Sequence, residues 1–421
     1  MQGKKWLTLG IATGVLFGLT GCGDGKSESK TEGSEKNTTI KFGMWDAMQK
    51  PGMQKLVDEF ETENPNIQVD IQVTPWDEYW TKMEAAATGG ELPDVFWMHT
   101  NEFLKYASND VLMDLSDLEG TNDFKDFPES LVSLATYKDK VYGVPKDFDT
   151  IALAYNKEIF DKAKVAYPDE TWDWSKLVEV AKQLTDKKQG VFGFSAGLED
   201  QEGYLPPIVE AGGYVIKDGK ARYTDSKTRE GVQFYVDLNS KDGVAPSLSQ
   251  IADNNTVSLF QSGKVAMCYM GSWRMATADE NEDISGKFDV AKLPKGENNR
   301  SIINGLSFVG STNTKYSTET KKFLSFLSSQ KAQDLQAETG TAISARKGAS
   351  DKWLTSYPDY NASVYIEMKD DAVPVSTSLT KSKWVVTEKE MMKRMLEGEV
   401  SVNEGTQAIQ DEIEKLLKTE E

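Results

Sequence analysis

Rings and hydrogen-bonding side chains that suit the binding of a small molecule follow two strand-like stretches near the N-terminus. They come after the alternating stretch 40–44 and around the end of the apolar stretch 94–98: Trp45, Asp46, Trp97, His99 and Asn101. An indole ring offers a flat apolar face, and a carboxylate or an amide accepts hydrogen bonds. Because ligands of open α/β sheets bind just past the carboxyl ends of strands, this placement favours noncovalent binding. The alternatives are a core position for Trp45, a helix cap for Asp46 and a structural role for His99.

A second pair of carboxylates, Asp147 and Asp149, lies in a polar connector. The connector follows Tyr142-Gly143-Val144-Pro145, which is typical of a strand end, and it leads into the apolar run 151–155, which has the length of a buried strand. Asn156 can cap the helix that comes next. A strand, a crossover and a second strand predict a join between two lobes, with both carboxylates facing the cleft. Solvated loop charges are the alternative.

The stretches around these residues alternate between the periodicities of strands and helices. Apolar residues recur at every second position over 40–44 and 67–73, and at every third or fourth position over 53–60 and 76–87. Strands and helices in this order predict right-handed βαβ units and a largely parallel sheet.

The composition excludes several classes of function. The chain has 421 residues, more than one hydrophobic core usually serves, so two lobes are expected. Its formal net charge of −19 would repel phosphate groups, and we expect no nucleic-acid partner. Two cysteines and one histidine leave little for a metal cluster or a Cys/His catalytic pair, and the sequence has no nucleophile elbow and no phosphate loop. We therefore expect no metal, no cofactor and no enzymatic activity.

The N-terminus has the pattern of a secretion signal. Two lysines precede the apolar run 6–20, which is too short to predict a membrane span, and the run ends in Leu19-Thr20-Gly21-Cys22. This ending resembles the lipobox of bacterial lipoproteins. The resemblance implies that 1–21 are removed and that Cys22 is acylated. An ordinary signal peptide with an incidental cysteine is the alternative.

The residues after Cys22 indicate a tether. The stretch 23–38 contains no apolar residue and cannot bury surface, so 22–38 should be a flexible link to the lipid. The folded part would then be anchored at the outer face of the cytoplasmic membrane, on the extracellular side, as in Gram-positive bacteria. Cys268, in an apolar run, is expected to be an inert buried thiol.

Short motifs run in order through nearly the whole mature chain: Thr88-Gly89-Gly90-Glu91-Leu92-Pro93-Asp94-Val95-Phe96, Tyr142-Gly143-Val144-Pro145, Ala154-Tyr155-Asn156-Lys157, Phe260-Gln261-Ser262-Gly263-Lys264-Val265-Ala266-Met267 and Gly271-Ser272-Trp273. In this order they resemble the extracellular solute-binding proteins of ABC importers, in particular the maltodextrin-binding-like family that binds sugars and oligosaccharides. The resemblance implies a two-lobed α/β periplasmic-binding-protein-like fold. Each lobe would have a central, mostly parallel sheet flanked by helices, and several hinge segments would join the lobes. The implied boundaries are 39–144 plus 305–352 for the first lobe and 145–304 plus 353–421 for the second.

The resemblance also implies a function and further site residues. A monomer would capture a sugar, in particular an oligosaccharide, in the cleft and deliver it to the permease subunits of an ABC transporter. Trp273 is expected to stack on the sugar, Glu202 and Tyr204, in a loop before a helix, to contact it from the second lobe, and Trp384 to act as a late stacking ring. The alternatives are a polyol, peptide or anion as cargo, or a tethered glycoside hydrolase that uses two of the many carboxylates.

Overall fold

The computed structural model describes residues 37–118, 124–251 and 255–420. The predicted signal segment 1–21, the lipidation site Cys22 and most of the tether lie outside the described residues. Within the described ranges, no helix combines the length and the apolar character needed to cross a membrane.

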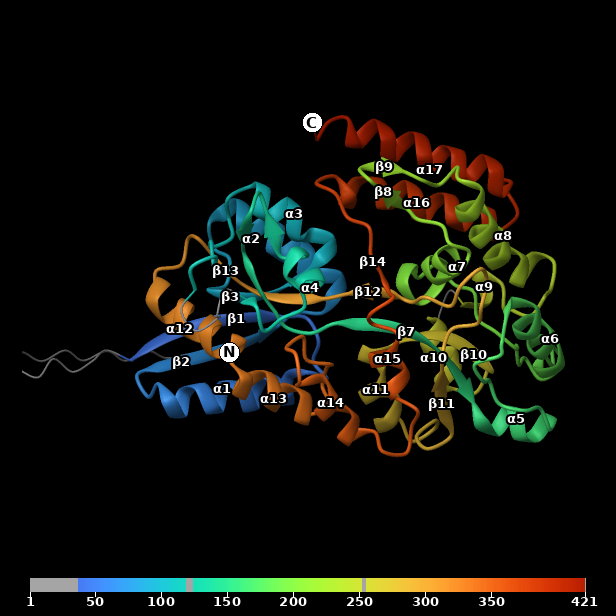
Figure 1. Cartoon of the computed structure of the whole chain (residues 1–421), viewed down its shortest axis with the longest axis horizontal. Helices are drawn as coiled ribbons and strands as arrows, with labels where there is room; N and C mark the ends of the chain where they lie inside the picture. Colours follow the sequence, from blue (N-terminus) through green and yellow to red (C-terminus); the bar gives the residue numbers. More distant parts are fainter. Residues whose placement is uncertain (1–36, 119–123, 252–254, 421) are drawn as a thin grey trace, which may run out of the picture. The chain divides into compact units, whose positions relative to one another are not determined.

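The first sheet contains, in spatial order, β2 (Ile67–Val73), β1 (Thr38–Met44), β3 (Val95–His99), β13 (Leu306–Gly310) and β6 (Gly143–Pro145). β1 pairs in parallel with β2 and β3, as the periodicity predicts, whereas β13 is antiparallel to both β3 and β6. Helices α2 (Trp76–Gly89) and α3 (Thr100–Ser108) lie on one side of this sheet, and α1 (Lys50–Glu63) and α13 (Gln330–Glu338) lie on the other (Figure 1). Side chains alternate along β3, so Phe96 and Met98 join the core under α2 and α3 while Trp97 joins the opposite core.

The second sheet is built around β7 (Asp149–Asn156), which is buried along its whole length. β7 is antiparallel to β10 (Met267–Gly271), β11 (Phe288–Ala291) and β12 (Ile302–Asn304), and β12 is parallel to the short β14 (Val373–Pro374). At the end of β7, the Asn156 side chain accepts the Ile159 N–H at 3.1 Å and caps the next helix, as predicted.

Both sheets are mixed, so the expectation of mostly parallel sheets is wrong. Two segments pass straight from one sheet to the other: β6 leads into β7 through 146–148, and β12 leads into β13 through Gly305. The two segments run in opposite directions side by side, with Ser307 opposite Pro145 and Ile303 opposite Thr150. β13 comes directly from the other sheet and therefore lies antiparallel to its neighbours β3 and β6. A helical crossover would instead join parallel strands of one sheet.

A third segment lies against the first crossing. The Phe148 N–H donates to Ile343 O at 3.1 Å, and the Ala345 N–H donates to Lys146 O at 3.3 Å. The stretch predicted to join two lobes thus runs from one sheet to the other, with two more segments beside it. The exact lobe boundaries stay a prediction.

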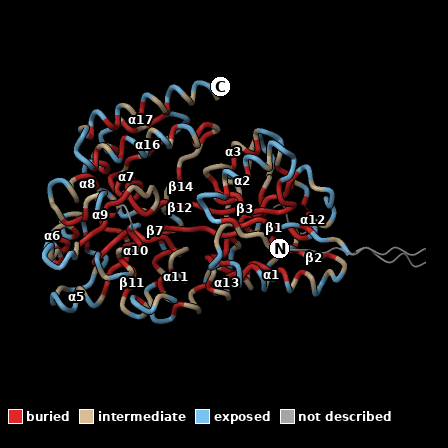
Figure 2. Tube along the Cα trace, turned by 180° about the vertical axis from the view of Figure 1, so that it is seen from behind, coloured by how far each residue is buried: buried red, intermediate tan, exposed pale blue. Residues whose placement is uncertain are grey.

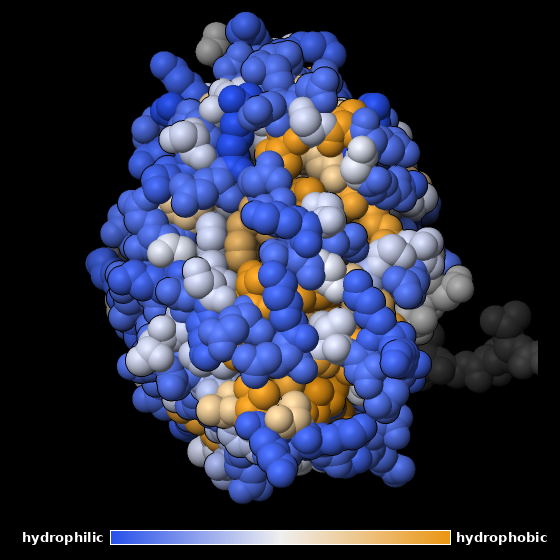
Figure 3. Space-filling model, turned by 90° about the vertical axis from the view of Figure 1, so that its right-hand side faces the viewer, coloured by the Kyte–Doolittle hydropathy of each residue, from blue (hydrophilic) through white to orange (hydrophobic). Residues whose placement is uncertain are grey.

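The remaining elements cover the two sheets. They are α4 (Glu129–Ser133), the hairpin β4 (Thr136–Tyr137) and β5 (Lys140–Val141), α5 (Lys157–Ala163), α6 (Trp174–Leu184), the π-helical turn η2 (Asp200–Tyr204), α7 (Leu205–Glu210), the hairpin β8 (Ile216–Lys217) and β9 (Lys220–Ala221), α8 (Ser226–Ser240), α9 (Leu248–Ile251), α10 (Thr256–Gln261), the 3-10 turn η3 (Ser272–Arg274), α11 (Met275–Glu280), α12 (Ser317–Ser328), α14 (Ser350–Trp353), the 3-10 turn η4 (Leu354–Ser356), α15 (Ser363–Glu367), α16 (Lys381–Leu396) and α17 (Val402–Leu417). Buried residues follow the strands, and exposed residues lie on the outer faces of the helices (Figure 2). The side that carries α5, α6 and α8 is mostly hydrophilic, with apolar areas in between (Figure 3).

Candidate ligand-binding site

A cluster of aromatic rings surrounds the end of β1. The Trp45 ring lies edge-to-face against Trp76, with 5.2 Å between centroids, and against Trp97 at 5.1 Å. Trp97 is fully buried and packs against the inner side of Trp45. Trp45 itself is half-buried, and Trp76 is 43% exposed. The arrangement leaves indole surface of Trp45 and Trp76 available to an apolar ligand face.

Asp46 follows Trp45 and is held by the turn before α1. Its carboxylate accepts the Met48 N–H at 2.8 Å and the Gln49 side-chain N–H at 3.1 Å. A carboxylate has about four acceptor positions, so these two bonds orient Asp46 and leave capacity for a further donor.

Asp46 and Trp273 line the same cavity, although they follow strands of different sheets. The cavity has a volume of about 120 Å³, and its polar lining also includes Gln49, Thr277, Glu280, Thr339 and Thr341. Trp273 lies in the turn after β10, and its ring covers Gly271 so closely that a Cβ there would be 2.1 Å from Trp273 Cζ3. Two residues predicted separately from the sequence are therefore brought together.

Glu202 supports the Trp273 turn from the second sheet. It lies in the π-helical turn η2 rather than in the loop expected from the sequence, and it is 5% exposed. Arg274 forms an ion pair with it, with 3.1 Å between Nη2 and Oε2, and the Gly271 N–H donates to Oε1 at 3.0 Å. Burial raises the pKa of Glu202, an effect that Arg274 opposes.

Asp149 supports the same turn from β7. The Ser272 hydroxyl donates to its Oδ1 at 2.6 Å. Burial, followed by the negative charge of Asp147, raises the pKa of Asp149 to about 7. Asp149 is thus a buried acid that is shared by the first crossing and the Trp273 turn.

His99 has a clear structural role in this structure. Its Nδ1 accepts the Asn101 N–H at 3.1 Å and caps α3, and its Nε2 lies 2.7 Å from the side-chain amide nitrogen of Asn304. Burial lowers its pKa to about 4, so the ring is neutral at neutral pH. Asn101 is half-buried at the first turn of α3.

Besides His99, Asp149 and Glu202, four more of the predicted contact residues are buried: Trp97, Asp147, Tyr204 and Trp384. Asp147 pairs with Lys146 and accepts the Leu306 N–H, so its carboxylate does not face a cleft as expected. The Tyr204 hydroxyl donates to Glu388 at 3.0 Å, and the Trp384 indole N–H donates to Ser378 at 3.1 Å. Because they are buried, these four side chains can affect a ligand only by positioning the residues around them.

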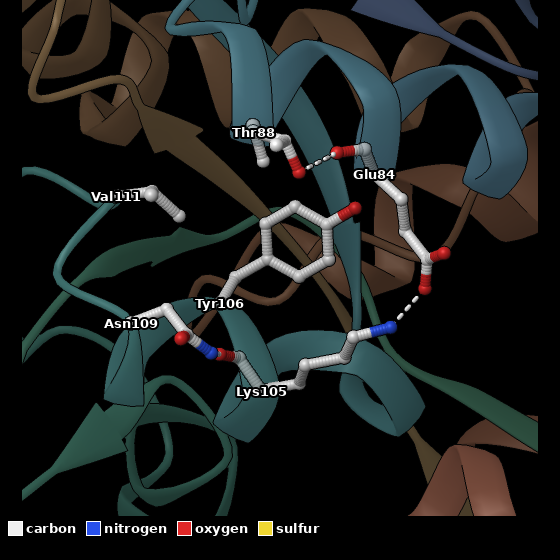
Figure 4. A pocket seen from close by; sticks show the side chains of 7 residues that line it. Glu84, Thr88, Lys105, Tyr106, Asn109 and Val111 are labelled. Atoms are coloured by element: carbon white, nitrogen blue, oxygen red, sulfur yellow. Dashed lines mark hydrogen bonds and ion pairs between the residues drawn. The ribbon is translucent and has the colours of Figure 1, made fainter.

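A larger groove of about 440 Å³ lies elsewhere, between the ends of α2 and α3. Figure 4 shows Tyr106 between the Glu84–Lys105 ion pair and the side chains of Thr88 and Asn109. The predicted site residues lie outside this groove, and it adds nothing to the cavity near Trp273.

Two groups near the site, the exposed Trp76 and the half-buried Arg274, were not predicted. Trp76 follows Pro75 just after β2, so the strand-end rule that selected Trp45 and Trp97 could have found it. Arg274 is adjacent to Trp273, but no sequence pattern indicated a role for it, because its ion-pair partner Glu202 is distant in the sequence.

The comparison with protein families defines the class. Residues 55–362 match the model of the bacterial extracellular solute-binding protein family. The chain belongs to this family, whose members bind solutes and are not enzymes.

Individual relatives match over most of the chain. A putative binding protein of Brucella abortus is 25% identical over 333 residues, which cover 77% of each chain. A galactooligosaccharide-binding protein of Bacillus subtilis is 26% identical over 323 residues, covering 73% of this chain and 71% of the relative. The structure of the ABC substrate-binding protein Lmo0181 of Listeria monocytogenes, in complex with cycloalternan, superposes with a TM-score of 0.84 at 24% identity, covering 91% of this chain and 100% of that one. This last likeness establishes the shared α/β periplasmic-binding-protein fold.

Proposed function

We propose that this protein captures an oligosaccharide between two lobes and delivers it to the permease of an ABC transporter. The observation that carries the proposal is the cavity shared by Asp46 and Trp273, because the two residues follow strands of different sheets. A ligand held there contacts both halves of the molecule at once.

The chemistry of the site suits a sugar. The C–H faces of a pyranose ring stack on indole rings such as those of Trp45, Trp76 and Trp273. Its hydroxyl groups are donors and acceptors, and Asp46 and the exposed part of Arg274 can meet them. In this proposal Asp149 and Glu202 orient the Trp273 turn, and the buried ring of Trp97 supports the ring of Trp45.

The relatives support the same cargo class. The Bacillus subtilis relative is named for galactooligosaccharides, and the Listeria monocytogenes structure contains cycloalternan and is called an ABC substrate-binding protein. A ligand that touches both lobes stabilises the closed form by its differential affinity for that form. The permease would then recognise the closed monomer, and no bond needs to break.

The lipid anchor at Cys22 is part of this proposal. We expect radiolabelled palmitate to be incorporated into the wild-type protein expressed in a Gram-positive host, and Cys22→Ala to abolish the label and release the protein into the medium. A Cys22→Ala variant that is labelled and retained like the wild type would contradict the anchor without affecting the binding proposal.

The binding proposal can be tested with a thermal-shift panel of gluco-, galacto- and arabino-oligosaccharides, together with mannitol, a tripeptide and citrate. A sugar at a free concentration of 100 times its Kd stabilises the folded protein by about 2.7 kcal/mol, which raises Tm by several degrees. A shift with mannitol, the tripeptide or citrate but with no oligosaccharide would refute the proposal. Release of shorter sugars, detected by chromatography, would indicate a hydrolase.

A substitution then tests the site itself. Trp273→Ala should weaken sugar binding by about tenfold in calorimetry, because stacking on an aromatic ring contributes up to about 1.5 kcal/mol beyond the area it buries, and about 1.4 kcal/mol corresponds to a factor of ten. Tyr316→Ala is the matched control, since Tyr316 is 39% exposed but lies at the start of α12, outside the cavity lining. Equal affinities of the two variants would remove Trp273 from the site.

A further inference from the structure

A fully buried lysine, Lys146, lies in the first crossing between the sheets. Its ammonium group donates to Gln49 Oε1 at 3.0 Å, pairs with the Asp147 carboxylate and lies 4.4 Å from the centroid of the Trp97 ring. A buried ammonium is costly unless it is paired and hydrogen-bonded, so these partners keep it in one position.

Lys146 is connected to the cavity through two of its partners, Gln49 and Trp97. Gln49, which accepts from the ammonium, donates its own side-chain N–H to Asp46 Oδ2 at 3.1 Å. Trp97, under the ammonium, packs edge-to-face on Trp45. Both residues that follow β1 at the proposed site, Trp45 and Asp46, are therefore held indirectly by this lysine.

Lys146 and its neighbour Asp147 are also hydrogen-bonded to the second crossing and to the third segment. Asp147 accepts the Leu306 N–H at 3.0 Å through the carboxylate oxygen that is not paired with the ammonium. The Lys146 backbone N–H donates to Leu306 O at 2.8 Å, and its carbonyl accepts the Ala345 N–H. Both crossings and the third segment beside them thus meet at this residue.

We propose that Lys146 is a positioning residue that couples the Trp45–Asp46 part of the site to the crossings, with Gln49 as the link to Asp46. The atoms form one chain, from Asp46 through Gln49, Lys146 and Asp147 to the Leu306 amide. A rotation at the crossings moves Asp46 and Trp45 with it, so closure and the placement of these contacts become one event. The consequence for binding rests on the proposed function; the coupling itself does not require a ligand.

The coupling can be measured by amide hydrogen exchange of the ligand-free protein. Gln49→Leu removes the link, and exchange at the Leu306 amide should become at least about fivefold faster, although the Leu306 N–H donates to Asp147 and not to Gln49. Gln410→Leu is the matched control, because Gln410 is 6% exposed against 7% for Gln49 and bonds to Ala221 O within the second half of the chain. Unchanged exchange at Leu306 in Gln49→Leu, or an equal increase in the control, would overturn the coupling.

A second variant keeps the test decisive if Gln49→Leu does not fold. Gln49→Glu still offers an oxygen to Lys146 but repels the Asp46 carboxylate. We expect exchange at Leu306 to match the wild type, while the Met48 amide, which donates to Asp46, exchanges several times faster. Equal changes at both amides, or at neither, would contradict the proposed order of contacts. Because no sugar is added, failure of this test is separate from failure of the sugar-binding proposal.

Discussion

The Ser272 hydroxyl lies 2.6 Å from Asp149 Oδ1, so the residue before Trp273 is attached to the strand that begins at the first crossing. This bond connects a proposed stacking ring to the segment along which the sheets are joined. Both members of the pair are buried, and the bond is therefore protected from competition by water.

Replacing Asp149 should change how the free energy of unfolding depends on pH. The folded protein holds the Asp149 proton up to about pH 7, whereas an unfolded chain releases it near the ordinary value of 3.8. Stability should therefore fall as the pH rises between these values, by at most ~1.4 kcal/mol per pH unit. Asp149→Asn keeps an acceptor for Ser272 and lacks this effect. The difference in unfolding free energy between variant and wild type, measured in urea from pH 4 to 8, should increase with pH. A constant difference would contradict the buried acid.

The chain's one histidine provides a direct spectroscopic test. Burial lowers the pKa of His99 to about 4 from its ordinary 6.5, so the native protein should show an imidazole NMR signal that does not move between pH 8 and 5.5. The same signal in urea should titrate near 6.5. The unfolded chain then binds the proton first, and stability is lost as the pH falls from 6.5 toward 4. Native titration near 6.5 would show that the ring is open to solvent.

Glu210 is a second buried acid, outside the proposed site. Burial raises its pKa to about 8, although Trp174 Nε1 donates to its Oε2 at 2.5 Å and the Tyr269 hydroxyl donates to the same oxygen at 3.3 Å. Glu210→Gln keeps an acceptor for both donors and removes the cost of ionisation.

The unfolding free energy of Glu210→Gln should therefore exceed that of the wild type at pH 9 and approach it at pH 5, as judged by urea denaturation. Glu210→Ala is the contrasting variant. It removes the ionisable group too but leaves the Trp174 N–H unpaired, so it should be about 1–3 kcal/mol less stable than Glu210→Gln at both pH values. A Gln variant that is equally destabilised at both pH values would mean that the native group is ionised.

Gly271 should be required for the orientation of Trp273. Gly271→Ala would place a methyl group 2.1 Å from the indole ring, and the ring must turn away. We expect binding of the oligosaccharide selected by the thermal-shift panel to weaken about tenfold or more in calorimetry. Gly89→Ala is the control, because the nearest atom to its added Cβ is 4.0 Å away. Equal binding by both variants would show that the ring position does not matter.

Local features of this chain could be read from the residues alone. The alternation over 67–73 and the helical spacing over 53–60 correspond to β2 and α1, and Asn156 caps its helix, because these features depend on near neighbours. The motif order also identified the family, since Gly, Pro and Trp were matched together at ordered positions.

The direction of the strands and the exposure of the rings depended on the tertiary structure. Nothing local distinguishes Trp45 from Trp97, yet one keeps exposed ring surface and the other is fully buried, because burial is set by helices that pack on the sheet from elsewhere in the chain. Asp147 was expected to face a cleft and instead pairs with its neighbour Lys146 inside the first crossing. The sequence by itself determined the elements, the family and the residue types at the strand ends. Only the folded chain decided that Asp46 and Trp273 share a cavity, because that cavity is lined by segments more than 200 residues apart.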